Sequence, residues 1–350
     1  MSSRTPSQRA SRMATRKISR RNGMRTAPGP VENESDRAVL RSRLLTWYDL
    51  HKRDLPWRAD RDPYRVWLSE IMLQQTRVAA VLEHYRRFLS TFPTVQKLAT
   101  AREASVLAAW SGLGYYRRAR LLHAAAKVVV KKFGGEFPKT NEELRALPGI
   151  GRYTAAAIGS IAYNEPVAVV DGNVERVIAR VEGKGLVGEE LWTGAESWLD
   201  RERPGDFNQA IMELGATVCQ PRAPQCLLCP LRDLCATRGE LKETTTASRQ
   251  NKREIRFGLA RRGSDVLLVQ RGKGESLMPG MWELPEYRGN GDCRELDSLR
   301  HSITVTDYKV RVMELTDPGP SAGRWVAASR LSTLPLTGLA RKILRRVELL

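Results

Sequence analysis

Apolar residues recur at three- and four-residue spacing through roughly the first two thirds of the chain, which is the period of an amphipathic helix. The repeat begins at Asp36 and continues to a group of cysteines that starts at Cys219. We expect helices over residues 36–50, 66–92, 104–110, 117–133, 141–147, 153–163, 174–181 and 208–218. The pattern therefore predicts an all-α domain of about 200 residues, which we place at residues 36–236.

The hydrophobic pattern changes beyond that domain. Residues 237–252 are mostly polar and have the composition of a linker. Apolar and polar residues then alternate over residues 255–259 and 265–269, which is the period of a half-buried strand. These observations predict a smaller α+β domain over residues 253–350.

The first 35 residues have a different composition, with eight arginine or lysine residues and almost no apolar side chains. Such a segment buries too little apolar surface to order itself, so we expect residues 1–35 to form a disordered basic arm. Its composition fits an organellar transit peptide, a loose DNA-binding arm, or an upstream start that precedes Met13 or Met24.

Charge and hydropathy narrow the class of partner. The formal net charge is +19, and most of it lies outside the basic arm. A strongly basic protein binds polyanions, since each neutralised phosphate releases condensed counterions, so nucleic acid is the expected partner. No apolar run is long enough to span a membrane, so we expect a soluble protein without a membrane partner.

A short Leu-Pro-Gly-Ile-Gly stretch separates two of the expected helices. Thr140 is a plausible N-cap for the first helix, and an Ala-rich run follows Gly151. Gly149 and Gly151 let the backbone turn sharply and approach a partner, and the adjacent helix N-terminus favours a phosphate. The alternative interpretation is an ordinary αα-hairpin.

Four of the five cysteines lie together with the spacing C-x6-C-x2-C-x5-C, at Cys219, Cys226, Cys229 and Cys235. Without a secretory signal, four thiols on one short segment indicate a metal site rather than two disulfides. Zinc and a 4Fe-4S cluster both accept four sulfur ligands, and only one pair has the close spacing of a zinc knuckle, which favours iron-sulfur. Arg222 lies in a proline-rich loop between the first two ligands, where we expect it to contact a DNA backbone.

Taken together, the motifs resemble those of MutY-type adenine DNA glycosylases, which belong to the helix-hairpin-helix, iron-sulfur DNA glycosylases. The matching motifs are Leu55-Pro56-Trp57-Arg58, the stretch from Leu68 to Thr76, the stretch from Gly112 to Arg120, the hairpin, Asp171-Gly172-Asn173-Val174 and the four cysteines.

This resemblance implies both a fold and a function. The fold is an all-α helix-hairpin-helix glycosylase domain with a 4Fe-4S loop at 219–235, followed by a smaller α+β Nudix-like domain that recognises 8-oxoguanine. The function is base excision repair on double-stranded DNA, by hydrolysis of the N-glycosidic bond of adenine mispaired with 8-oxoguanine or guanine. We expect a monomer, cytoplasmic and associated with the bacterial nucleoid, or located in the nucleus or mitochondrion if the source is eukaryotic.

Cleavage of an N-glycosidic bond requires protonation of a poor leaving group and stabilisation of a cationic sugar, which two carboxylates with different pKa values perform economically. The resemblance assigns leaving-group protonation to Glu70 and cation stabilisation or attack to Asp171, with Tyr153 as a hydrogen-bonding neighbour. Asp171 also has the sequence context of a helix N-cap, and the two roles are compatible. Glu70 has the alternative of a structural carboxylate, bound by backbone groups or by an arginine.

Tyr153 separates this chain from related enzymes. Endonuclease III-like enzymes place a lysine at this position of the hairpin and use it to form a Schiff base with the sugar. A tyrosine here favours a monofunctional, hydrolytic glycosylase.

A glycosylase must also extrude its target base and fill the gap left in the duplex. By resemblance, Gln74 wedges into the space beside the partner of the extruded adenine, and Tyr115 intercalates next to 8-oxoguanine. Core packing is the alternative role for Tyr115 and Tyr116. The remaining pocket residues that the resemblance implies are Arg53, Trp57, Arg58, Leu73 and Gln209.

The C-terminal part contains a Met-Pro-Gly-Met-Trp-Glu-Leu-Pro stretch at residues 278–285 that looks like a turn of the Nudix-like domain. Residues 286–299 lack the glutamate cluster of a Nudix hydrolase, so we expect a binding module rather than a nucleotide hydrolase. Where relatives carry Phe-Ser-His, this chain has residues 301–305, in which Thr304 would replace the serine hydroxyl and Ile303 the apolar wedge. The competing functions are a bifunctional lyase, a non-catalytic DNA-binding relative and a nucleotide hydrolase.

Overall fold

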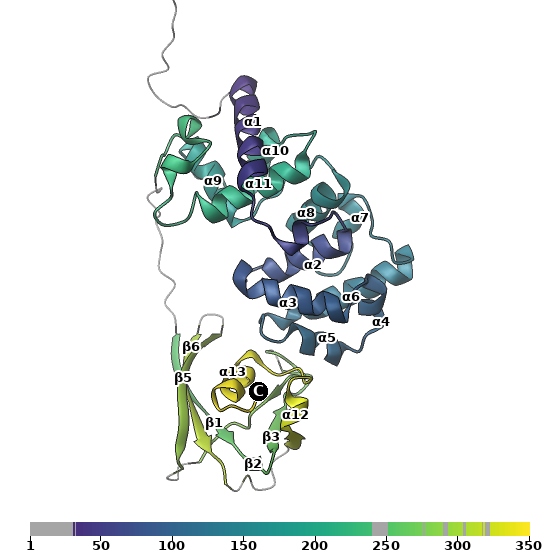
Figure 1. The fold of residues 1–350 in the computed structure, drawn as a ribbon, viewed down its shortest axis with the longest axis vertical. Helices are drawn as coiled ribbons and strands as arrows, with labels where there is room; N and C mark the ends of the chain where they lie inside the picture. The colour runs from purple at the N-terminus through teal and green to yellow at the C-terminus, as the bar shows by residue number, and fades with distance from the viewer. Residues whose placement is uncertain are drawn as a thin grey trace, which may run out of the picture.

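The computed structural model describes residues 31, 33–239, 251–275, 277–289, 293–303, 306–316, 318 and 323–350. Helices fill the first long stretch, which we call the helical region (33–239), and strands dominate the rest, which we call the sheet region (251–350) (Figure 1). Most of the predicted basic arm and of the linker lies outside the described residues. None of the described helices is both long and apolar enough to cross a bilayer.

The helical region confirms the predicted all-α fold. Its helices are α1 Glu34–His51, α2 Pro63–Leu73, α3 Val78–Thr91, α4 Val95–Thr100, α5 Glu103–Trp110, α6 Tyr116–Phe133, α7 Asn141–Arg145, α8 Arg152–Tyr163, α9 Gly172–Glu182, α10 Gly188–Trp198 and α11 Pro204–Thr217. Three short 3-10 turns lie at Pro56–Arg58, Cys226–Leu228 and Arg232–Leu234.

Two details differ from the sequence expectation. The expected helix over 66–92 is two helices, because the chain turns between α2 and α3 with Gln75 in the left-handed region at φ 56°. Helices α4 and α10 were not expected: α4 has only 6 residues, too few to show a period of 3.6.

Local capping explains where the helices near the hairpin begin. The Thr140 hydroxyl accepts a hydrogen bond from the Glu143 amide at 3.3 Å, which confirms the predicted N-cap of α7. Helix α2 begins at Pro63, which suits the first helical position, and the Asp62 side chain caps it through the Arg65 amide at 2.9 Å.

The helical region has two hydrophobic cores. One core is built from α2 to α8 around the fully buried Trp67 and Trp110. The other joins α1, α9, α10 and α11 to the cysteine segment around Trp198 and Phe207. The segment that leads into α9 passes from the first core to the second, which places Asp171 at the boundary between them.

The sheet region has α+β architecture, as predicted. Its strands are β1 Asn251–Leu259, β2 Arg261–Arg262, β3 Asp265–Gln270, β4 Trp282–Glu283, β5 Glu295–Ile303, β6 Thr306–Glu314 and β7 Arg324–Ala327, and its helices are α12 Ala328–Leu331 and α13 Gly338–Arg346. One sheet has the order β1-β6-β5, with β1 parallel and β5 antiparallel to β6. The other has the order β2-β3-β4, with β7 paired to β3.

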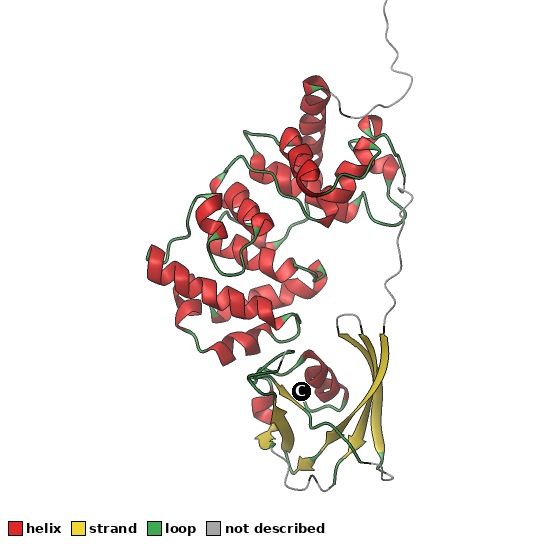
Figure 2. Cartoon of the chain, turned by 180° about the vertical axis from the view of Figure 1, so that it is seen from behind, coloured by secondary structure: helices red, strands yellow, loops and turns green. Residues whose placement is uncertain are grey.

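Helix α13 lies between these two sheets (Figures 1 and 2). Its apolar residues Leu339, Ile343 and Leu344 are buried in a core shared with both sheets. Its basic residues lie on another face and line the cavity described next.

Candidate active site

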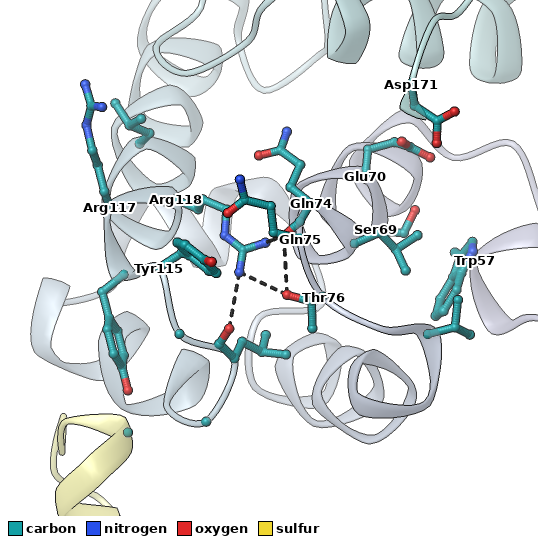
Figure 3. Close-up of a pocket in the computed structure, with 18 of the residues that line it drawn as sticks. Trp57, Ser69, Glu70, Gln74, Gln75, Thr76, Tyr115, Arg117, Arg118 and Asp171 are labelled. Carbon is teal, nitrogen blue, oxygen red and sulfur yellow. Dashed lines mark hydrogen bonds between the residues drawn. The ribbon is translucent and has the colours of Figure 1, made fainter. Parts of the chain in front are cut away.

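A cavity of about 1810 Å³ lies where the two cores of the helical region meet the sheet region. Ten of the predicted site residues line it: Arg53, Trp57, Arg58, Glu70, Leu73, Gln74, Tyr115, Tyr153, Asp171 and Gln209. Residues from α2, α8, α9 and α11 meet here although they are far apart in the sequence. Figure 3 shows Glu70 and Asp171 near each other on one side of the cavity.

Glu70 lies on α2 and is buried, with 7% of its surface exposed. Its Oε2 accepts a hydrogen bond from the Tyr153 hydroxyl at 2.5 Å. Burial raises the pKa of Glu70 to about 7, and the nearby Asp171 charge adds to the increase, while the Tyr153 hydrogen bond and Arg58 oppose it. A substantial fraction of Glu70 is therefore neutral near pH 7, as a general acid requires.

Tyr153 lies in the first turn of α8, directly after the hairpin. Burial and the charges of Glu70 and Asp171 raise the pKa of its phenol well above the ordinary value. The phenol therefore keeps its proton and remains a hydrogen-bond donor to Glu70. Its oxygen also lies 3.7 Å from the Met212 sulfur on α11.

Asp171 is the N-cap of α9, which confirms the structural role expected from its sequence context. Its Oδ1 accepts from the amides of Asn173 at 2.9 Å and Val174 at 2.8 Å, and its Oδ2 accepts from the Asn173 side chain at 2.8 Å. These bonds hold the carboxylate in one orientation at the cavity wall. The cap and a catalytic role are compatible in this geometry.

The second buried carboxylate of the cavity, Glu213 on α11, was not found by sequence reasoning. Its two oxygens accept hydrogen bonds from Arg53 Nε at 2.6 Å and Arg58 Nη2 at 2.8 Å. Arg53 and Arg58 do line the cavity as predicted, but their guanidinium groups are bound to Glu213. The available signal was a glutamate within the apolar α11 sequence, four residues after Gln209.

Figure 3 shows Tyr115 on the side of the cavity away from Asp171, with Gln74 between them. The Gln74 amide donates to Thr154 Oγ1 at 3.3 Å. Tyr115 is 52% exposed and has φ 47°, so the predicted core-packing alternative does not describe it.

Arg118, on α6, organises the side of the cavity that carries Tyr115. It donates to the carbonyls of Ile71 at 2.9 Å and Leu113 at 3.3 Å and to Thr76 Oγ1 at 3.2 Å. Its guanidinium also lies 5.1 Å from the centre of the Tyr115 ring. One arginine thus ties the end of α2 to the loop that carries Tyr115.

Comparisons with known proteins identify the superfamily to which this chain belongs. The model of the HhH-GPD superfamily of base excision DNA repair proteins matches residues 68–185, a span that contains Glu70, Tyr153 and Asp171. The solved structure of a thermostable thymine-DNA glycosylase is 32% identical with a TM-score of 0.54, and the match covers 57% of this chain and 95% of that one. The chain belongs to the HhH-GPD superfamily.

Curated relatives narrow the resemblance within the HhH-GPD superfamily. An adenine DNA glycosylase of Mus musculus is 51% identical over 216 residues, covering 57% of this chain and 42% of the mouse protein. One of Arabidopsis thaliana is 40% identical over 328 residues, covering 79% of this chain and 51% of the plant protein. The predicted resemblance to MutY-type adenine DNA glycosylases is confirmed. The chain spans about half the length of these relatives.

The hairpin that gives the HhH-GPD superfamily part of its name lies between α7 and α8. Gly149 has φ 76°, and a Cβ atom there would lie 2.7 Å from Leu121 Cβ, so this position needs glycine for two reasons. Gly151 differs from the expectation: it is the N-cap of α8 with φ −92°, which any residue adopts. Neither glycine lines the cavity. Gly151 is exposed and its neighbourhood is open, which leaves the α8 N-terminus accessible.

The four cysteines of this HhH-GPD protein line a second, smaller cavity between α9 and α11. Two of the sulfurs accept hydrogen bonds. Arg180 donates to Cys219 Sγ at 3.3 Å, and the Arg238 amide donates to Cys235 Sγ at 3.4 Å. Such donors suit metal-bound thiolates. Within the described parts of the chain, no three His, Cys, Asp or Glu side chains are arranged to hold a single metal ion.

Arg222 does not line the active-site cavity. Arg222 is exposed on the loop between the first two cysteines. Thr304 lies outside the described residues, and the side chain of Ile303 does as well, so their predicted contacts with 8-oxoguanine stay predictions.

Asn208 is a second functional residue that sequence reasoning missed, because a buried amide has no motif of its own. Its Oδ1 accepts from the Val169 amide at 3.1 Å, and its Nδ2 donates to Ser160 Oγ and the Val167 carbonyl at 2.9 Å each. These bonds fix the segment that carries Asp171 against α8.

Proposed function

We propose that this chain is an adenine DNA glycosylase, which hydrolyses the N-glycosidic bond of adenine mispaired with 8-oxoguanine or guanine in double-stranded DNA. The observation that carries the proposal is the pair of carboxylates, Glu70 and Asp171, in one cavity with the Tyr153 phenol bound to the first. The names of the curated relatives support adenine as the target base.

The two carboxylates divide the chemistry. Neutral Glu70 would protonate the adenine base and so convert it into a better leaving group. Asp171, held by two backbone amides and Asn173, would stabilise the positive charge that develops on the sugar. Once Glu70 has given up its proton, its carboxylate is suited to orient the attacking water.

The hairpin residue supports a monofunctional enzyme. A glycosylase that also cleaves the strand uses an amine to form a Schiff base with the sugar. The side chain at this position is the phenol of Tyr153, which donates its hydrogen bond to Glu70. We therefore expect excision to leave an intact abasic strand.

Extrusion of the adenine costs a few kcal/mol of stacking and pairing, which contacts from the protein must offset. Exposed Tyr115 and half-buried Gln74 line the cavity, which suits the predicted roles of intercalation and wedging. Four basic residues of α13, Arg341, Lys342, Arg345 and Arg346, line the same cavity and favour a phosphate backbone there.

The sheet region would act as the Nudix-like module that recognises 8-oxoguanine, and Cys219, Cys226, Cys229 and Cys235 would hold a 4Fe-4S cluster. The cluster would join four positions of the 219–235 segment to one another, in a cavity that α9 and α11 also line. The purified protein should then be brown and contain about four iron atoms per chain. A colourless protein with one zinc ion would contradict this assignment. We further propose a monomer that acts at cellular DNA.

Single-turnover excision from duplexes with adenine opposite 8-oxoguanine, guanine or thymine tests the proposed activity. We expect the wild-type protein to release adenine from the first two and Asp171→Asn to lose most of that rate. Asp200→Asn is the matched control, because Asp200 Oδ1 also accepts from two backbone amides, at 2.8 and 3.0 Å, but lies outside the cavity. A wild-type protein that releases no adenine from any duplex would refute the proposal, and strand cleavage without added base would refute monofunctionality.

A further inference from the structure

The sheet region is hydrogen-bonded to the loop that carries Tyr115, and these contacts do not involve the catalytic residues. The loop, residues 111–116, joins α5 to α6. Its two ends, Ser111 and Tyr116, are 1% and 3% exposed, whereas Tyr115 between them is 52% exposed. The buried ends and the exposed ring therefore belong to one short segment.

Both ends of the loop bind one carbonyl of the sheet region. Ser111 Oγ and the Tyr116 hydroxyl each donate to the Leu336 carbonyl oxygen at 2.9 Å. A carbonyl has two lone pairs, so it accepts both bonds. Arg341 Nε on α13 in turn donates to Ser111 Oγ at 2.8 Å, which satisfies the serine as acceptor.

The Leu336 carbonyl has a fixed position within the sheet region. Leu336 is fully buried and pairs with Trp282 of β4, and the flanking Thr337 amide donates to the Trp282 carbonyl at 2.9 Å. Met281, which precedes Trp282 in the chain, is buried in the core of the helical region. The position of Leu336 therefore follows the docking of the sheet region as a whole.

Residues 112–115, between the two hydrogen-bonded ends of the loop, have little conformational freedom. Gly112 has φ 111°, and a Cβ atom there would lie 2.7 Å from His84 Nε2. The Leu113 amide donates to the Trp110 carbonyl at 3.2 Å, and Trp110 Nε1 donates to the Gly114 carbonyl at 3.1 Å. A displacement at either end must therefore pass to Tyr115.

We propose that Ser111 is a positioning residue through which the docked sheet region sets the placement of Tyr115. In this arrangement, the sheet region, which is proposed to contact the base opposite adenine, is linked by hydrogen bonds to the loop of Tyr115. Tyr115 is the side chain proposed to fill the gap that the extruded adenine leaves in the duplex. The inference rests on the proposed function for the role of Tyr115, but the contact itself does not depend on DNA.

Hydrogen exchange of the full-length, DNA-free protein tests the contact directly. Ser111→Ala removes the bond to Leu336 and leaves Arg341 Nε without its acceptor, and we expect the amides of residues 112–115 to exchange about tenfold faster than in the wild type. Arg330→Met is the matched control, because Arg330 is an exposed basic residue of α12 outside the cavity, and it should leave this exchange unchanged. Unchanged exchange at 112–115 in Ser111→Ala would overturn the inference, even if the melting temperature falls.

A double-mutant cycle tests the coupling to extrusion. Ser111 does not line the cavity but its partner Arg341 does, and the Tyr115→Ala background separates an effect through Tyr115 from an effect through Arg341. We expect a loss of about threefold to tenfold in the wild-type background and no further loss in the Tyr115→Ala background. Independent, additive losses would overturn the inference. A wild type without adenine excision would refute the proposed function instead, and the exchange experiment would still decide the contact.

Discussion

Two buried glutamates, on α2 and α11, line the same cavity and differ in charge. Glu70 on α2 is 7% exposed and Glu213 on α11 is 1% exposed, so burial disfavours the charged form of both. For Glu70, burial prevails and raises the pKa to about 7. For Glu213, hydrogen bonds from Arg53 and Arg58 outweigh burial and lower the pKa below the ordinary value.

The difference lies in the partners of the two carboxyl groups. Glu70 accepts a hydrogen bond from a neutral phenol, and the charge of Asp171 raises its pKa further, whereas Glu213 is bound by two guanidinium groups. The α2 wall therefore holds a carboxyl group that gains and loses a proton near neutral pH. The α11 wall holds a permanent anion that keeps two arginines in place. Burial alone identifies neither role.

The largest expected effect is the loss of excision in Glu70→Gln. The amide occupies the same space but does not donate a proton, so single-turnover release of adenine should fall by about 10²- to 10⁴-fold. The melting temperature should change little, because no cationic partner is left unpaired. Glu142→Gln, on the exposed surface of α7, is the control. Retention of the full rate in Glu70→Gln would contradict the assignment of the acid.

Glu213→Gln should act on folding instead. It leaves the charges of Arg53 and Arg58 near a neutral amide, and the loss of one partner from a buried ion pair destabilises a protein by about 3 kcal/mol or more. The partial exposure of Arg53, 38% of its side chain, reduces this cost. Denaturant unfolding measures the change, again with Glu142→Gln as the reference. An unchanged free energy of unfolding would show that Glu213 is not the anchor of this wall.

The smallest expected effect is a shift in the pH dependence of the excision rate. Excision should decline as the pH rises through about 7, where Glu70 loses its proton. The Tyr153 hydrogen bond lowers the pKa of Glu70, so Tyr153→Phe should move this decline to higher pH, and a pH–rate profile of each protein measures the shift. A decline at the same pH in both proteins would contradict the role of the phenol.

The contributions of the two glutamates to the free energy of unfolding should also change in opposite directions as the pH rises. The folded protein binds the Glu70 proton more tightly than the unfolded chain, so that contribution is complete below the ordinary pKa of 4.5 and is lost as the pH rises through about 7. The contribution of Glu213 is present above 4.5 and is lost as the pH falls, because its folded pKa is lowered. Denaturant unfolding of Glu70→Gln and Glu213→Gln across this range separates the two.

Much of the fold followed from local patterns. The apolar period predicted most helices, and Thr140 and Asp171 marked two helix starts, because capping involves residues only two or three positions apart. The break at Gln75 was missed, because Arg118 stabilises that turn from 42 or more residues away in the sequence.

The sequence by itself determined the helical class, the change to a strand period, the cysteine group and the identity of the Glu70, Tyr153 and Asp171 motifs. These properties depend on the spacing of neighbours along the chain. Only the tertiary structure decided that Glu70 binds a phenol while Glu213 binds two arginines, and that Leu336 holds both ends of the 111–116 loop. A pKa and a contact between regions depend on which groups meet in space, and no local pattern encodes those meetings.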